Sequence, residues 1–283
     1  MPVRKLVKLP SLSTVAAGSI ATCKVPTGNK SYRTFMLKAW NNGTLMTKEQ
    51  MKTLLKRIAI KINGVVRFDM LATDAIDLLM TYKDRAFKDG KLLMPFSDDY
   101  ARFAQQEDAL SLNTLDIQTL DFEVEIADEA VNPKLELSAF EDLPYEINGS
   151  MVQYKLGAIR EVRTFNHAIS GAMEYEIADL PKSNGMLMAL HFKPSVLGSI
   201  EKITIKADNL ELTNIDLDLN RQMLSEIGSR KPLDDFEHID FLILDRLQDA
   251  FNIKAVADFG IIIKTKEKTD LRMVVETLNV PQV

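Results

Sequence analysis

The chain has 283 residues, of which 46% are hydrophobic and 27% charged, a composition typical of folded globular proteins and long enough for two domains. A net charge of −5 at pH 7 argues against nucleic-acid binding by bulk electrostatics, and we expect no recognition of nucleic-acid sequence. The single cysteine, Cys23, excludes an intramolecular disulfide framework. With no apolar run of the ~18–20 residues that span a bilayer and no signal-peptide core, we expect a soluble, unsecreted protein made in a reducing cytoplasm.

Short β-rich segments dominate the first half of the chain. We expect strands at 19–25, 31–40, 58–62, 65–68, 91–96 and 120–127. Asn63-Gly64 supplies positive φ at both central positions of a type I′ turn, so it predicts a hairpin. Residues 120–127 alternate apolar side chains with acids, which is typical of a strand with one face in water.

Helical spacing predicts three short helices in the same half. In 47–56, Thr47 is a candidate N-cap, and Gln50 three residues later completes a capping box. Thr73 is a candidate cap for a helix at 74–83, and residues 98–106 form the third.

The second half of the chain repeats the order of these elements. A strand–turn–strand segment at 203–212, centred on Asp208-Asn209, matches the hairpin at Asn63-Gly64, and 258–263 matches 121–126. The remaining elements expected here are strands at 156–165, 175–178, 186–192 and 238–244 and helices at 217–227 and 245–251. A period this long predicts two copies of one domain rather than a solenoid.

We therefore predict an all-β fold with short helices, in which two jelly-roll β-sandwiches lie side by side in one chain. The predicted domains are an N-terminal jelly roll at 1–135 and a C-terminal one at 136–283. Residues 128–144 contain two prolines and several acids and are the predicted link between them.

The N-terminal segment carries Arg4, Lys5 and Lys8 among apolar residues. It predicts a basic arm that lies against another surface, and a frayed terminus is the alternative.

No pattern for catalysis is present. The sequence has no nucleophile elbow, no phosphate-binding glycine loop and no paired metal-binding histidines, so we predict no enzymatic activity. His167, His191 and His238 lack the spacing of metal ligands and are expected to be structural or at the surface.

Residues 216–220 resemble the start of a calcium loop, but Arg221 and Ile227 occupy the positions that need Gly and Glu, which favours a helix-capping role. Cys23 has no activating neighbour and is expected to be buried and inert.

Several segments resemble the corticovirus major capsid protein. Residues 9–18 with 24–28 resemble the start of that protein, Glu176-Ile177-Ala178-Asp179-Leu180-Pro181 with 190–193 resembles its middle, and Ile239-Asp240-Phe241 resembles a later strand. The similar segments occur in the same order over most of the chain.

The resemblance implies a double jelly roll that forms homotrimers with a pseudo-hexagonal outline. In that family such trimers tile an icosahedral shell over an internal membrane in a bacterial virus. The implied partners are other copies of the chain in the same and neighbouring capsomers, the membrane or its proteins, and a vertex protein. The implied location is the virion, after synthesis in the bacterial cytoplasm.

The resemblance implies no organic cofactor, and calcium accompanies the capsid in that family as a structural ion. We expect Arg4, Lys5 and Lys8 to form an arm that faces the membrane.

Two alternative functions remain open: a tandem sandwich that binds glycans or a receptor, such as a viral spike, and an enzyme on a jelly-roll scaffold. A glycan site usually needs exposed aromatic rings, and the chain has one tryptophan, Trp40.

Overall fold

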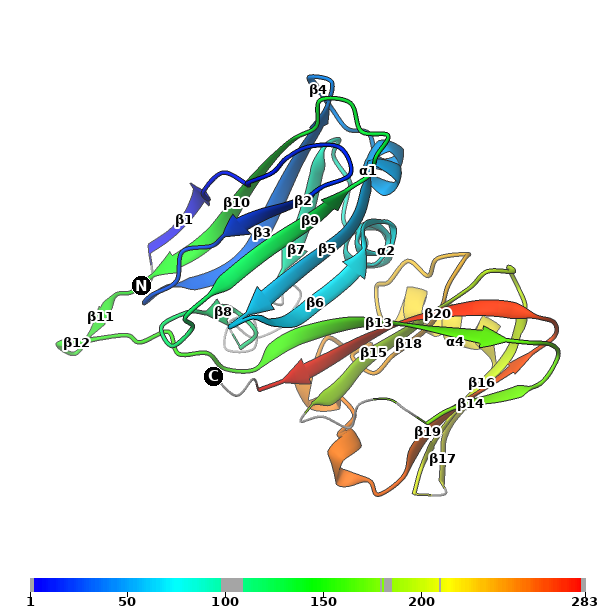
Figure 1. Ribbon diagram of the computed structural model, residues 1–283. Coiled ribbons are helices and arrows are strands. Elements are labelled where there is room, and N and C mark those ends of the chain that lie inside the picture. The colour runs from blue at the N-terminus through cyan, green and yellow to red at the C-terminus, as the bar shows by residue number, and fades with distance from the viewer. Residues whose placement is uncertain (1–2, 98–108, 179, 181–184, 209, 281–283) are drawn as a thin grey trace. The chain divides into compact units, whose positions relative to one another are not determined.

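The computed structural model describes residues 3–97, 109–178, 180, 185–208 and 210–280. The chain divides after Glu161 into two compact units, and Val162–Asn279 forms unit 2. Antiparallel sheets dominate both units and short helices connect some of their strands, as Figure 1 shows. The prediction of an all-β fold with short helices is confirmed.

Unit 1 contains two sheets that pack face to face. Its strands are β1 (Val3–Lys8), β2 (Ile20–Lys24), β3 (Ser31–Asn41), β4 (Thr44–Leu45), β5 (Leu55–Ile62), β6 (Val65–Leu71), β7 (Lys91–Pro95), β8 (Leu112–Asn113), β9 (Leu120–Ile126), β10 (Lys134–Leu143), β11 (Glu146–Ile147) and β12 (Ser150–Met151). The first sheet has the order β1-β10-β3, with β4, β7 and β8 also paired to β3. The second sheet has the order β2-β9-β5-β6, and β11 pairs with β12 in a separate hairpin.

Unit 2 is built in the same way. Its strands are β13 (Ile159–Ile169), which begins at the end of unit 1, β14 (Glu174–Ile177), β15 (Met186–Pro194), β16 (Ile200–Ala207), β17 (Leu210–Ile215), β18 (Glu237–Asp240), β19 (Phe259–Thr265) and β20 (Thr269–Asn279). The first sheet has the order β13-β20-β15-β18 and the second β14-β19-β16-β17.

The two units share one strand topology. If β4, β8, β11 and β12 are set aside, each unit pairs its first strand with its eighth, the eighth with the third, and the third with the sixth. The second strand pairs with the seventh, the seventh with the fourth, and the fourth with the fifth. This crossing pattern of two interleaved sheets is a jelly roll. Its repetition confirms the predicted duplication.

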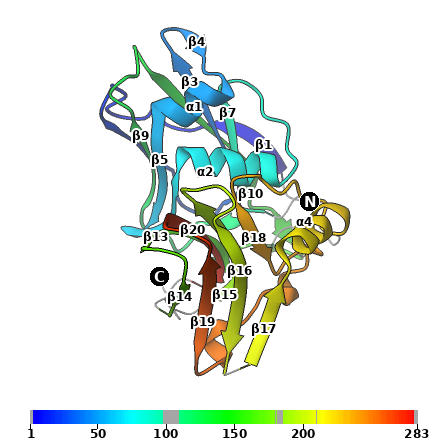
Figure 2. The same ribbon diagram turned by 90° about the vertical axis from the view of Figure 1, so that its right-hand side faces the viewer.

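One helix position is shared by the two units, the one after the fifth strand. In unit 1, α1 (Lys48–Leu54) precedes β5, and α2 (Ala72–Ile76) follows β6 and continues as a π-helix, η1 (Asp77–Tyr82). In unit 2, α4 (Leu217–Glu226) follows β17, and Figure 2 shows it at the margin of the unit beside β16 and β18. Two 3₁₀ turns, η2 (Leu247–Asp249) and η3 (Ile253–Ala255), precede β19.

One predicted cap is confirmed and one is wrong. Thr47 and Gln50 form both hydrogen bonds of a capping box at the start of α1. Thr73 caps nothing, because β6 runs directly into α2 and Leu71 is the N-cap residue, without a side-chain hydrogen bond. Thr73 therefore lies inside the first turn of α2.

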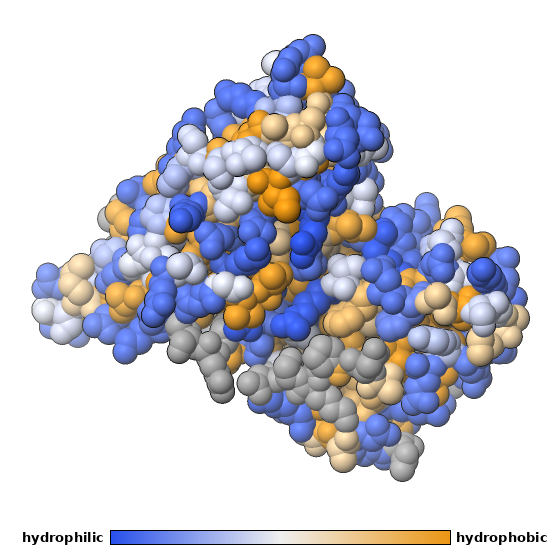
Figure 3. Space-filling view, viewed as in Figure 1, coloured by the Kyte–Doolittle hydropathy of each residue, from blue (hydrophilic) through white to orange (hydrophobic). Residues whose placement is uncertain are grey.

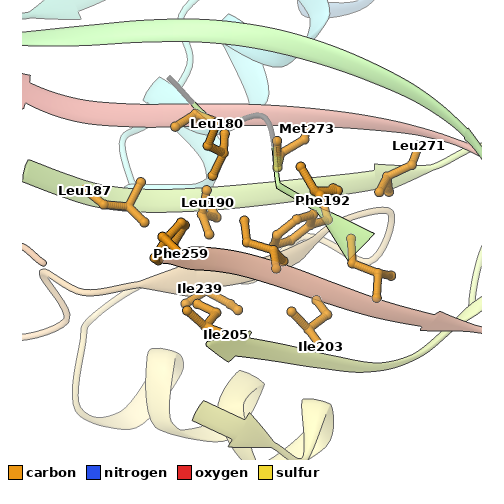
Figure 4. Packing of buried hydrophobic residues seen from close by; sticks show 14 of the residues in the cluster. Leu180, Leu187, Leu190, Phe192, Ile203, Ile205, Ile239, Phe259, Leu271 and Met273 are labelled. Carbon is orange, nitrogen blue, oxygen red and sulfur yellow. The ribbon is translucent and has the colours of Figure 1, made fainter. Parts of the chain in front are cut away.

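Apolar side chains from both sheets fill the centre of each sandwich. In unit 1, Phe35 of β3 meets Phe122 of β9 edge-on, with ring centroids 6.0 Å apart and both side chains fully buried. In unit 2, Phe192 of β15 lies among Ile203, Ile205 and Met273, as Figure 4 shows. Burial of this apolar area is the main stabilising term for each unit.

A turn side chain ties the second sheet together in both units. Asn63 has φ +50°, and its Oδ1 accepts hydrogen bonds from the backbone N–H groups of Gln118 and Thr119, just before β9. Asp208 has φ +49°, and its Oδ1 accepts from Ala257 and Asp258, just before β19. The hairpin that suggested the repeat therefore also fixes the start of the seventh strand in each unit.

The predicted link between the domains is a strand. Residues 134–143 form β10, which pairs with β1 on one side and β3 on the other. The predicted boundary between residues 135 and 136 falls inside this strand, whereas the chain divides after Glu161. The sequence prediction missed this strand because of the prolines and acids in 128–144, although buried side chains alternate along it: Leu135, Leu137 and Ala139 point into the core.

Other elements differ less from the predictions. The expected strand at 238–244 is the shorter β18, and the helix expected at 245–251 is the single turn η2. The long strand β20 was not predicted, although it lies between β13 and β15. The helix expected at 98–106 lies outside the described residues.

The Asn63 interaction gives a testable expectation. Asn63→Ala removes two hydrogen bonds and puts alanine, which tolerates positive φ less well than asparagine, at this position. We therefore expect the free energy of unfolding to fall by about 1–3 kcal/mol. Asn63→Asp keeps the acceptor, as Asp208 does in unit 2, and should lose far less. Denaturant midpoints of the two variants measure the difference, and equal midpoints would show that the side-chain bonds contribute little.

Candidate functional site

Two of the three histidines meet in the interior of unit 2. Nδ1 of His191 on β15 lies 2.8 Å from Nδ1 of His238 on β18, and the two side chains are 0% and 1% exposed. The N–H of Leu233 donates to Nε2 of His238, so that nitrogen carries no proton and Nδ1 of His238 donates to His191. The other ring edge of His191 faces Glu276, with Nε2 to Oε1 3.4 Å. The pair is closed to substrate and has a structural role, as the sequence predicted.

The third histidine lines a hollow in unit 2. The hollow has a volume of about 560 Å³ and lies over the ends of β13, β15 and β20. Nδ1 of His167 lies 3.4 Å from the Tyr175 hydroxyl, and Lys193 in the wall forms a 2.5 Å ion pair with Asp235. Ser195 also lines the hollow, and its hydroxyl oxygen lies 3.2 Å from the hydroxyl oxygen of Thr269.

No metal site is assembled within the described part of the chain. There, no three His, Cys, Asp or Glu side chains converge closely enough to hold an ion. Asp216 instead caps α4, because its Oδ1 accepts from the backbone N–H groups of Asp218 and Leu219 at 3.0 Å each. The capping interpretation of 216–220 is therefore confirmed.

Cys23 is fully buried on β2. Its Sγ lies 3.2 Å from the Pro10 carbonyl oxygen. Burial, aided by the negative charge of Asp121, raises the pKa of the thiol from 9.0 to about 11. The thiol is therefore protonated at neutral pH, as expected of an inert cysteine.

The predicted basic arm is the edge strand β1. Arg4 lies 3.3 Å from Asp142, Lys5 lies 3.5 Å from Glu141, and Lys8 lies 3.3 Å from Glu136, all on β10. Asp142 and Glu141 are buried, and Arg33 and Lys30 also pair with them. The arm thus lies against a surface, and that surface belongs to its own unit. Contact with a membrane stays a prediction.

The outer face of the first sheet of unit 1 is apolar and basic, and we name it the basic sheet face. Strand alternation and register place these side chains on it: Leu6 and Lys8 of β1; Lys134, Glu136, Ser138 and Phe140 of β10; Thr34, Met36, Lys38 and Trp40 of β3; and Lys91 and Leu93 of β7. Leu6 is 65% exposed and lies opposite Phe140, which is 38% exposed. Four lysines and one glutamate give this face a net positive charge.

The outer face of the second sheet in unit 1 is different. Its charges compensate each other within the sheet, since Arg57 pairs with Asp69 on β6 and Lys61 pairs with Glu123 on β9. Figure 3 shows this face toward the viewer, with hydrophilic residues over much of β2, β9 and β5. Its paired charges and hydrophilic residues are typical of a surface exposed to solvent.

The two halves of the chain match two family models. Residues 6–144 match the viral coat protein P2 N-terminal domain, and residues 159–281 match the viral coat protein P2 C-terminal domain. The chain belongs to the viral coat protein P2 family. The resemblance to the corticovirus capsid protein is therefore confirmed, and the chain is a viral coat protein located in the virion.

Solved structures show the same fold. The major capsid protein P2 of bacteriophage PM2 is 21% identical, with 99% of this chain and 98% of that chain covered and a TM-score of 0.84. A chain of Sulfolobus turreted icosahedral virus is 10% identical (99% and 90% covered, TM-score 0.65), and the Faustovirus major capsid protein is 8% identical (99% and 91% covered, TM-score 0.63). No curated protein matches the sequence. These likenesses confirm the predicted double jelly roll.

The buried thiol of this coat protein allows a simple chemical test. At pH 8, a pKa of about 11 in place of 9.0 leaves about a hundredfold less thiolate, so Cys23 in the native protein should react with Ellman's reagent at least that much more slowly than in denaturant. Because the folded pKa is raised, the associated stability is complete below pH 9 and is lost as pH rises toward 11. A native rate equal to the denatured rate would contradict the burial of Cys23.

Proposed function

We propose that this coat protein is a major capsid protein whose homotrimers, pseudo-hexagonal in outline, tile an icosahedral shell over an internal membrane. The observation that carries the proposal is the repeated jelly roll in a chain of the P2 family. Two similar units in one chain give a threefold trimer six similar edges, which suits a hexagonally packed shell. The chain acts after synthesis in the cytoplasm of a bacterial host.

The proposed role is structural and without enzymatic activity. In support, the described residues bury the thiol of Cys23 and both rings of the His191–His238 pair in the interior of the two units. None of the helices in the described part of the chain has the length and apolar composition needed to cross a bilayer.

The glycan-binding alternative has little support. Trp40 is half-buried, and its ring lies under the ammonium groups of Lys38 and Lys134, at 5.9 and 4.7 Å from the ring centroid. These lysines occupy positions from which a sugar would stack on the ring.

Native mass at neutral pH tests the trimer. We expect a stable species of about three times the 31.9 kDa chain mass, and shells or capsomer arrays by electron microscopy at high concentration. A second measurement with a calcium chelator tests for calcium between copies. Dissociation of the trimer by the chelator, reversed by added Ca²⁺, would place an ion at the contact. A strict monomer at high concentration would overturn the proposal, and a glycan array would then be the next measurement.

Deletion of residues 1–10 tests the predicted membrane arm. If Arg4, Lys5 and Lys8 meet anionic lipid, the deletion should reduce sedimentation with phosphatidylserine-containing vesicles, with a larger effect at low salt. Neutral vesicles are the control. Unchanged binding to both kinds of vesicle would exclude the arm as a lipid contact.

A further inference from the structure

The outward side of α4 carries an apolar stripe. Leu219, Met223 and Ile227 are 56%, 43% and 55% exposed, while Asn220 and Leu224 are the buried residues of the helix. The spacing of four residues places the three side chains in one line about 12 Å long, at 1.5 Å per residue. A line of large apolar side chains in water marks a surface that another molecule covers.

The rim of this stripe is acidic. Asp216, Asp218 and Glu226 are exposed around it. The only cation of α4, Arg221, is directed back into unit 2, where it donates to Glu237 and to the carbonyl oxygens of Leu233 and Phe236. The outward side of α4 is therefore apolar with a negative rim.

The basic sheet face of unit 1 has the complementary character. Its apolar side chains, among them Leu6, Phe140, Met36 and Leu93, lie between lysines. The side chains of Lys8 and Lys134 are 64% and 62% exposed, and Glu136 is shared between them. An apolar strip with a positive rim matches an apolar stripe with a negative one.

The duplication gives an independent argument. The unit 1 counterpart of α4, α2 with η1, is buried along almost its whole length. The unit 2 counterpart of the basic sheet face is also buried, as the outward residues Ala189, His191, Val274 and Glu276 of β15 and β20 show. The outward side of α4 and the basic sheet face are thus the exposed members of the two pairs of equivalent surfaces.

We propose that α4 of one copy docks on the basic sheet face of a second copy of this chain. This inference rests on the proposed trimer and names its contact. The two surfaces lie on different units, so the contact runs head to tail and closes into a ring when repeated about a threefold axis. A second copy is the occupant that the structure favours, because α4 offers both an apolar stripe for the apolar strip and acids for the lysines around it.

The first experiment compares native mass across a dilution series for the full chain and for Met223→Glu. A carboxylate in the middle of the stripe should raise the concentration at half-dissociation by at least about tenfold, because a charge would be buried without a partner. Leu197→Glu, at a residue that is 68% exposed in the loop after β15, is the matched control and should leave the mass unchanged. Circular dichroism and thermal melts confirm that each variant folds.

A charge exchange tests the pairing of the two surfaces. Asp218→Lys with Glu226→Lys should dissociate the trimer, and so should Lys8→Glu with Lys134→Glu. A chain that carries all four substitutions restores opposite charges at every contact of the ring and should recover the trimer.

The outcomes separate this inference from the proposed function. A wild-type monomer would overturn both. A wild-type trimer that Met223→Glu leaves intact would overturn the α4 contact alone. Dissociation by the α4 variants without rescue in the fourfold variant would overturn the basic sheet face as its partner. A trimer unaffected by Lys8→Glu with Lys134→Glu, together with lost binding to anionic vesicles, would assign that face to lipid instead.

Discussion

The hydrogen bonds from Asn63 and Asp208 hold the same point in each jelly roll. Each side chain sits at a turn with positive φ and accepts two backbone N–H groups just before the seventh strand begins. The seventh strand lies between the second and the fourth, so its start sets the register of the whole second sheet. With that register fixed, alternate side chains such as Phe122 in unit 1 and Ile261 in unit 2 point into the core.

Buried charges complete the edges of the sandwiches. Arg33 is 2% exposed and lies 2.9 Å from Asp142, which also meets Arg4 from the edge strand. In unit 2, Arg230 pairs with Asp240 and Asp245 and holds the segment between α4 and β18. Loss of one partner from such a pair leaves a buried charge uncompensated, a cost of roughly 3–5 kcal/mol. These pairs therefore specify which strands and segments close each sandwich.

The surfaces of unit 1 divide by charge balance. On the second sheet, Arg57 and Lys61 are neutralised by neighbouring acids of the same sheet, and that face is suited to water. On the first sheet, lysines outnumber acids and apolar side chains lie exposed between them. A coat protein acts through surfaces of the second kind, because assembly needs apolar area to bury and charge to select the partner.

The sequence by itself determined the duplication, the turns and most strands. Asn63-Gly64, the Thr47 capping box and the alternation in 120–127 are local signals, and local sterics or hydrogen bonds decide them. The tertiary structure alone decided that 134–143 is a strand, because its apolar alternation is short and its acids find their cations on β1 and β3. It also decided that His191 meets His238, since residues far apart in sequence become neighbours only through the pairing of β15 with β18. The basic sheet face was equally hidden, because its lysines come from four strands that only the jelly-roll crossing places side by side.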